Sequence, residues 1–176
     1  LQQRLKLTTI FVTHDQEEAN TTSDRMAVLN DGVIQQIGTP MDLYDRPENL
    51  FVANFLGTAN VMQGIVEEDA GRAVFSSQGG NKVPLGTQER GPCSIIFRPQ
   101  NVLIGEASAE PIEGRTKLAG TVRHTEFLGN TIRYAVDVGT DIVLIDDSHQ
   151  QDSHSYAVGA DVGLFVDQHQ VQALKV

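Results

Sequence analysis

His14 and Asp15 end a short run of apolar and β-branched residues that begins at Thr8. Such a run is typical of a strand buried on both faces of a parallel sheet, so we expect a strand over residues 8–14. The carboxyl ends of strands in open α/β sheets face the ligand sites of those folds. An imidazole held there can donate a hydrogen bond to a phosphoryl oxygen or bridge to a water molecule. For an isolated strand-end histidine, packing against its neighbours is the commoner explanation. The residues that flank His14 must therefore distinguish packing from a role at a ligand site.

Three further sets of residues could form sites, and each has a simpler explanation. Residues 146–154 hold three aspartates and two histidines, but this serine- and glutamine-rich stretch lacks apolar support, which favours a solvated loop over a metal site. Val122, His124 and Glu126 alternate along an expected strand, and a half-exposed face explains them better than an acid–base pair. Cys93 is expected to be a small buried residue, because no histidine base lies near it in sequence. We therefore expect no metal site.

The composition argues against several classes of protein. The 176 residues include 13 Lys and Arg against 23 Asp and Glu, and the net charge of -10 repels phosphate backbones and anionic lipids. We therefore expect no nucleic-acid partner and no direct membrane insertion, and no apolar run is long enough to span a bilayer. A single cysteine is typical of a reducing compartment. Because the first residue is leucine and no signal peptide is recognisable, we interpret the sequence as a fragment of a longer parent protein.

The first 57 residues mix helix and strand patterns. Acidic residues cluster just after His14 at the start of an expected helix, where the helix dipole favours negative charge. The turn residues 30–32 lie between two apolar runs and predict a hairpin. Thr39 and Pro40 suit the cap and first position of a helix that ends before Pro47. The other elements expected here are a helix end over residues 1–7 and a short helix closed by Gly57.

From residue 58 onward the pattern changes to short β-rich runs separated by turn residues, as in a small barrel or sandwich. A faint internal repeat is also present. The triplets that begin at Gly64 and Gly120 are similar, and so are residues 96–102 and 165–171, which predicts two related β units packed together. Strands are expected over residues 60–68, 72–77, 93–99, 101–105, 118–129, 130–139, 141–147 and 161–168.

The stretches "TTIFVTHDQEEA" and "GTPMDLYDRPENLFVANFLG" resemble the carboxyl end of the nucleotide-binding domain of ABC importer ATPases that serve sugars, polyamines, iron and other small solutes. In that class an OB-like β region called TOBE follows, and "SIIFRPQNVLI" and "GTVRHTEFLGNTIRYAV" resemble its strands. The resemblance implies a mainly β fold with a small α/β amino-terminal portion. Residues 1–57 correspond to the truncated end of the nucleotide-binding domain, and residues 58–176 to the OB-like TOBE β-barrel region.

The same resemblance implies a role for His14 in the full-length parent. His14 corresponds to the switch histidine, which contacts the γ-phosphate and positions the attacking water. The parent is expected to bind ATP and Mg, to pair with a second ATPase subunit as a homodimer, and to dock on membrane permease subunits. Its β region is expected to be regulatory or dimer-stabilising. The parent is expected in the cytoplasm, peripheral to the inner face of the membrane.

This chain alone is expected to be inactive and to bind no cofactor. It contains neither a G-x-x-x-x-G-K-[ST] phosphate loop nor an LSGGQ signature. The first alternative is an OB-like module that binds a small ligand such as an oxyanion or a sugar. A nucleic-acid-binding OB module is weaker, because the chain has no Trp and 6% aromatic content. The transported solute is not specified by these residues.

Overall fold

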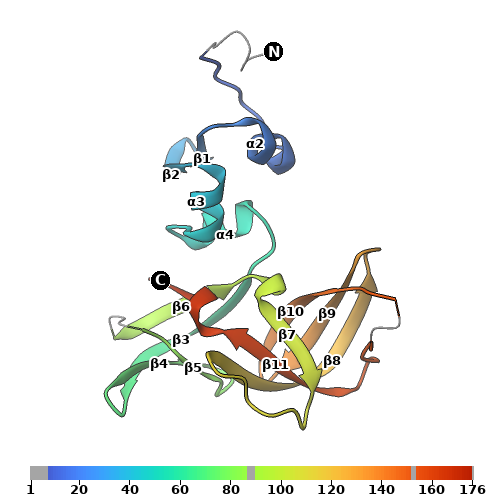
Figure 1. Ribbon diagram of the computed structural model, residues 1–176. Coiled ribbons are helices and arrows are strands. Elements are labelled where there is room, and N and C mark those ends of the chain that lie inside the picture. Colours follow the sequence, from blue (N-terminus) through green and yellow to red (C-terminus); the bar gives the residue numbers. More distant parts are fainter. Residues whose placement is uncertain (1–7, 87–89, 152–153, 176) are drawn as a thin grey trace. The chain divides into compact units, whose positions relative to one another are not determined.

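A computed structural model describes residues 8–86, 90–151 and 154–175 (Figure 1). The chain divides into two compact units, Leu1–Gly57 and Thr58–Val176, called here the amino-terminal unit and the β unit. The described elements of the amino-terminal unit are α2 (Gln16–Thr22), β1 (Met26–Asn30), β2 (Val33–Gly38), α3 (Pro40–Asp45) and α4 (Leu50–Phe55).

Local sequence signals determine most of the amino-terminal unit. Strands β1 and β2 pair as an antiparallel hairpin, and the turn between them places Asp31 and Gly32 at positive φ, as expected. The Thr39 hydroxyl caps α3 by accepting the backbone N–H of Asp42 at 3.1 Å. Asn49 caps α4 in the same way. The small core of this unit consists of Val28, Leu43, Val52 and Leu56.

The expected strand over residues 8–14 is wrong for this chain. The segment runs without strand pairing, and Ile10 and Val12 are 92% and 91% exposed. A strand of this kind is stable only beside hydrogen-bonded neighbours, and no strand in the described ranges pairs with it. The expected helix end over residues 1–7 lies outside the described residues.

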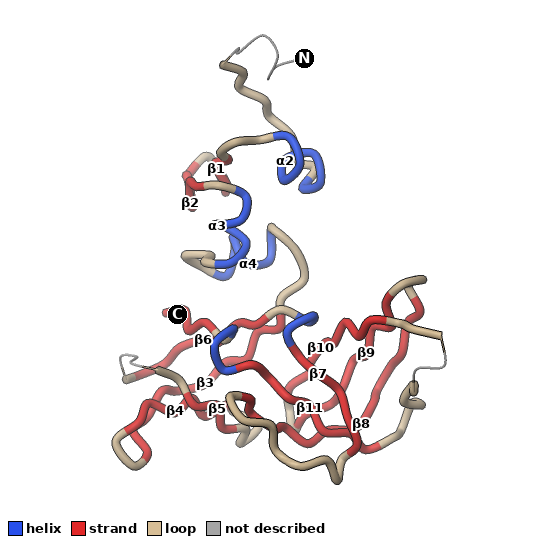
Figure 2. Tube along the Cα trace, viewed as in Figure 1, coloured by secondary structure: helices blue, strands red, loops and turns tan. Residues whose placement is uncertain are grey.

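The β unit contains two five-stranded antiparallel sheets (Figure 2). The strands of the second sheet curl until its edge strands β10 and β7 approach each other, which gives a half-barrel. In spatial order, the first sheet is β12 (Gln172–Lys175), β6 (Gly91–Phe97), β3 (Asn60–Asp69), β4 (Arg72–Ser77) and β5 (Lys82–Pro84). The second is β7 (Val102–Glu106), β11 (Asp161–Asp167), β8 (Arg115–Phe127), β9 (Thr131–Val138) and β10 (Asp141–Ser148).

The mainly β fold class expected from the sequence is confirmed, as are the eight expected strands with small differences at their ends. Strands β5 and β12 were missed, because three and four residues are too few to show an alternating pattern.

The two sheets share one topology, which confirms the internal repeat. Strand β6 continues through the 3₁₀ turn η1 (Pro99–Asn101) into β7, yet β7 joins the second sheet beside β11. Strand β11 continues through the 3₁₀ turn η2 (Gln168–Gln170) into β12, which joins the first sheet beside β6. The β unit thus consists of two halves, β3–β7 and β8–β12, and the last strand of each half pairs in the sheet of the other half. Asn101 and Gln170 hold equivalent positions in the two turns, and their side chains are hydrogen-bonded at 3.2 Å.

The repeated glycines Gly64 and Gly120 have a geometric cause. A Cβ atom at Gly64 would overlap the carbonyl oxygen of Ser76 on the neighbouring strand and lie 2.7 Å from the Phe75 ring. A Cβ atom at Gly120 would lie 2.6 Å from the carbonyl oxygen of Asp137 on β9. Both halves therefore need a residue without a side chain at these equivalent positions.

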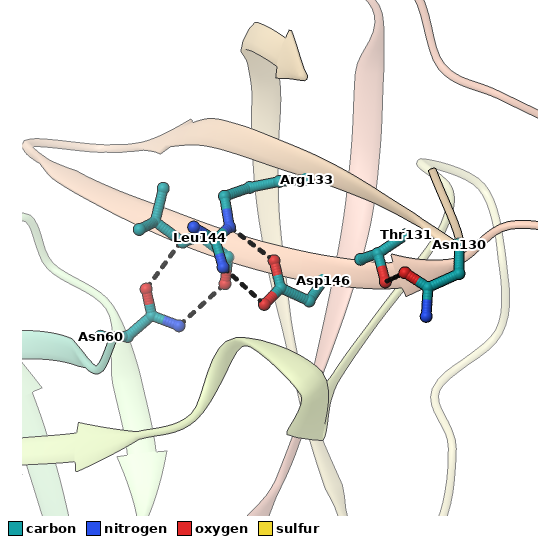
Figure 3. Close-up of polar contacts among 6 residues, drawn as sticks. All are labelled: Asn60, Asn130, Thr131, Arg133, Leu144 and Asp146. Atoms are coloured by element: carbon teal, nitrogen blue, oxygen red, sulfur yellow. Dashed lines mark hydrogen bonds and ion pairs between the residues drawn. The ribbon is translucent and has the colours of Figure 1, made fainter. Parts of the chain in front are cut away.

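The side chain of Asn60 ties the first sheet to the edge of the second (Figure 3). Its Nδ2 donates to the carbonyl oxygen of Leu144 at 2.8 Å, and its Oδ1 accepts the Leu144 N–H at 2.7 Å. Asn60 lies on β3 and is 3% exposed, whereas Leu144 lies on the edge strand β10. The amide thus takes the place of a neighbouring strand and satisfies two backbone groups of that edge.

We expect Asn60→Ala to destabilise the protein by about 2–3 kcal/mol, because it leaves the N–H and C=O of Leu144 without these partners. Urea unfolding followed by tyrosine fluorescence measures the change. Asn130→Ala is the control, since the Asn130 side chain is exposed and its one described bond accepts the Thr131 hydroxyl at 3.3 Å. A midpoint shift no larger for Asn60→Ala than for Asn130→Ala would show that the amide contributes little.

Candidate functional site around His14

His14 lies in a bend directly before α2, and its side chain is exposed. The next residue, Asp15, is the N-cap of the helix, as the acidic start predicted. One carboxylate oxygen of Asp15 accepts the backbone N–H groups of Glu17 at 2.8 Å and Glu18 at 3.1 Å. Two of the orphan N–H groups of the first turn are thereby satisfied, and the negative charge lies where the helix dipole favours it.

The hydroxyl of Thr13 connects the two sides of His14. It accepts the backbone N–H of Asp15 at 3.0 Å and donates to the Glu18 carboxylate at 2.9 Å. Within the described ranges no residue makes a hydrogen bond or ion pair with the His14 imidazole. The site therefore presents an imidazole without a partner among the described residues. The residues on either side of it, Thr13 and Asp15, are hydrogen-bonded to α2.

The acidic start of the helix, with Asp15 and Glu18, was expected from the sequence, but the hydrogen bonds of Thr13 to these two residues were not. The spacing contained a usable signal, because Asp15 and Glu18 stand three residues apart as in a capping box. In a capping box Glu18 would accept the Asp15 N–H directly, whereas here the Thr13 hydroxyl lies between them, and the sequence gives no signal for this arrangement.

The expected face shared by Val122, His124 and Glu126 is wrong. The register shifts between Val122 and His124, so Val122 pairs with the buried Val136 while His124 pairs with Ala135. This β-bulge turns His124 and Glu126 to the outer face, where both are exposed. Exposure on a strand face explains both residues without acid–base chemistry.

The described residues among 146–154 do not form one cluster, and Asp152 lies outside the described residues. Asp146 and Asp147 belong to β10 rather than to a loop. Asp146 accepts two hydrogen bonds from Arg133, at 2.6 and 2.8 Å (Figure 3), whereas burial raises the pKa of Asp147. The ring of His149 contacts Phe127 edge-on. Among the side chains that the structure describes, no group of three or more His, Cys, Asp and Glu is arranged to hold a metal ion.

Cys93 is buried in the core of the β unit, and burial raises the pKa of its thiol. A thiol of this kind is a weak nucleophile, which confirms its interpretation as a small buried residue.

No helix within the described ranges has the length and apolar character needed to cross a membrane.

The family of TOBE domains matches residues 95–174. Over 171 residues, the chain is 36% identical to the spermidine/putrescine import ATP-binding protein PotA of Bacteroides thetaiotaomicron, a match that covers 97% of this chain and 35% of that protein. It is also 39% identical over 150 residues to the Fe(3+) ions import ATP-binding protein FbpC of Rhizobium etli, covering 83% of this chain and 40% of that protein. The chain thus spans well under half the length of these relatives.

The fold is also similar to that of the cytoplasmic molybdate-binding protein ModG with molybdate bound. The TM-score is 0.57 at 16% identity, and the match covers 66% of this chain and 96% of that chain. At this identity the similarity establishes a common fold.

The chain contains a TOBE domain, within a mainly β, OB-like fold. Its homologues are the ATP-binding subunits of ABC importers, among them the polyamine- and iron-type proteins named above, and it corresponds to their TOBE-containing carboxyl-terminal part.

Proposed function

We propose that this chain is the carboxyl-terminal part of a full-length ATP-binding subunit that couples ATP hydrolysis to the import of a small solute. The observation that carries this proposal is the match to import ATP-binding proteins over 97% of the chain, which includes the segment around His14. The proposal assigns residues 1–57 to the end of the nucleotide-binding domain and residues 58–176 to the TOBE region.

In this full-length parent, His14 contacts the γ-phosphate and orients the attacking water. An exposed imidazole without a protein partner in the described ranges fits that task, because both nitrogens are available to ligand and water. Bound Mg would neutralise the charge that develops on the phosphates. Among the described residues no group of three or more His, Cys, Asp and Glu is arranged to hold a metal ion, and we propose that the Mg ligands lie in the nucleotide-binding domain of the parent.

The exposed apolar side chains of residues 10–12 support the same assignment. Ile10 and Val12 are almost fully exposed here, although their β-branched character suits a buried strand. We propose that residues 8–14 complete a parallel sheet of the nucleotide-binding domain, which would set His14 at the carboxyl edge of that sheet.

The proposed partners of the parent are a second copy of itself and the membrane permease subunits of an importer. The relatives are import ATP-binding proteins, which supports the permease partner. A subunit with these partners works at the cytoplasmic face of the membrane. The β unit then acts as a regulatory or dimer-stabilising module.

A second candidate function is binding of an oxyanion by the β unit. It is favoured by the fold shared with ModG, whose structure holds molybdate. Isothermal titration of this chain with molybdate, sulfate and phosphate tests it, and micromolar affinity for one of them would support it.

We expect this chain alone to release no phosphate from ATP and to bind ATP no more tightly than millimolar, because it has no phosphate-binding loop. The full-length parent is expected to bind ATP in the micromolar range and to hydrolyse it. Titration calorimetry and phosphate release on both proteins measure the difference. A parent without ATPase activity would refute the proposed function, and micromolar ATP binding by this chain would refute the dependence on the missing loop.

A further inference from the structure

We propose that Thr13 is a positioning residue for His14, and that its hydroxyl fixes the direction of the imidazole during ATP hydrolysis. The inference rests on the proposed function, because it concerns the same histidine. It adds Thr13 to the site, and the role of Thr13 follows from the hydrogen bonds that its hydroxyl makes.

The geometry is a capping box with a hydroxyl inserted. In an ordinary capping box the third residue of the helix accepts the backbone N–H of the N-cap residue directly. Here Glu18 is that third residue and Asp15 the N-cap, but the Glu18 carboxylate accepts the Thr13 hydroxyl, which in turn accepts the Asp15 N–H. The two bonds, at 2.9 and 3.0 Å, connect Thr13, which precedes His14, with Glu18 and Asp15, which follow it.

This chain of bonds matters because the imidazole has no anchor of its own in the described ranges. In the parent, residues 8–14 are proposed to form the strand that brings His14 to the sheet edge, and the Thr13 hydroxyl ties the end of that strand to Asp15 and Glu18, which follow His14. Without the hydroxyl, the segment before the N-cap gains conformational freedom. A reacting group displaced by about 1 Å can cost up to about a hundredfold in rate.

A purely structural role for Thr13 predicts a different outcome. If the hydroxyl served only to begin α2, its loss would lower stability and ATP affinity without a specific effect on the hydrolytic step. If it positions His14, its loss lowers kcat and leaves the KM for ATP unchanged, since substrate binding uses other groups.

The test begins with three single variants of the full-length parent. Thr13→Val removes the hydroxyl at nearly constant volume, and we expect about a tenfold lower kcat with unchanged KM. Thr13→Ser keeps the hydroxyl and is expected to stay within about twofold of the parent. Thr21→Val is the matched control, because the Thr21 hydroxyl bonds only within α2, to Glu17 and Glu18.

The double variant Thr13→Val with His14→Ala decides the mechanism. Because Thr13 acts through His14, we expect the double variant to be no slower than His14→Ala alone. Additive losses, an unchanged kcat in Thr13→Val, or a raised KM would each overturn the positioning role. A near-parent rate in His14→Ala would instead refute the proposed function itself, so the two failures are distinguishable.

Discussion

Replacing His14 with alanine in the full-length parent is expected to lower ATP hydrolysis by at least about a hundredfold while leaving ATP affinity nearly intact. The imidazole orients water and contacts the γ-phosphate in the transition state, whereas ATP is held mainly by its phosphate loop and bound Mg. Phosphate release and equilibrium binding of ATP, measured on the same preparation, separate the two effects. Solute uptake should stop together with hydrolysis.

Asp15→Asn is the control for this substitution. Asn caps helices about as well as Asp, so the hydrogen bonds to Glu17 and Glu18 are retained and only the charge near the helix start is lost. We expect a loss of stability of no more than about 1 kcal/mol and a near-parent hydrolysis rate. If His14→Ala hydrolyses ATP as fast as Asp15→Asn, the histidine is only a surface residue before a helix.

Gly64→Ala is expected to be the most destabilising small substitution in the β unit, at about 3 kcal/mol and about 10 °C in melting temperature. The added methyl group meets the Ser76 carbonyl and the Phe75 ring, and backbone cannot yield as a surface side chain can. Gly120→Ala should behave similarly, because its Cβ atom meets the Asp137 carbonyl in the equivalent place. Thermal unfolding followed by circular dichroism measures both.

Gly86→Ala is the matched control for the two glycine variants. A Cβ atom at Gly86 has no neighbour within 4 Å among the residues that the structure describes, and the φ of Gly86 lies outside the region that favours glycine. Its melting temperature should stay within about 2 °C of the parent. If Gly64→Ala and Gly86→Ala have the same melting temperature, β3 and β4 can separate at Gly64 at little cost. The repeated glycines then have no packing cause.

Much of this fold was predictable because its signals are local. The caps at Asp15, Thr39 and the turn at Gly32 depend on bonds that span two or three residues. Eight strands were found from their alternation, and the repeat was visible because two sheets of one topology need similar residues, above all glycine, at equivalent places.

The remaining features depend on residues far apart in the chain. The exchange of β7 and β12 between the sheets is decided by pairing partners, which alternation does not specify. The bulge between Val122 and His124 shifts the alternation of the strand by one residue, so His124 and Glu126 do not share the face of Val122. The strand expected over residues 8–14 failed because its residue types indicate burial, but burial depends on neighbouring strands that the described chain does not supply.

In the full-length parent, the imidazole of His14 is expected to contact the γ-phosphate of bound ATP. Magnetic dipolar coupling between ¹⁵N-labelled histidine and the ³¹P of a bound, non-hydrolysable ATP analogue in the full-length parent measures this contact directly. A hydrogen bond from the imidazole to a phosphoryl oxygen predicts a nitrogen-to-phosphorus distance of about 4 Å, and this coupling must disappear in His14→Ala. A spectrum with no γ-phosphate coupling that depends on His14 would contradict the account.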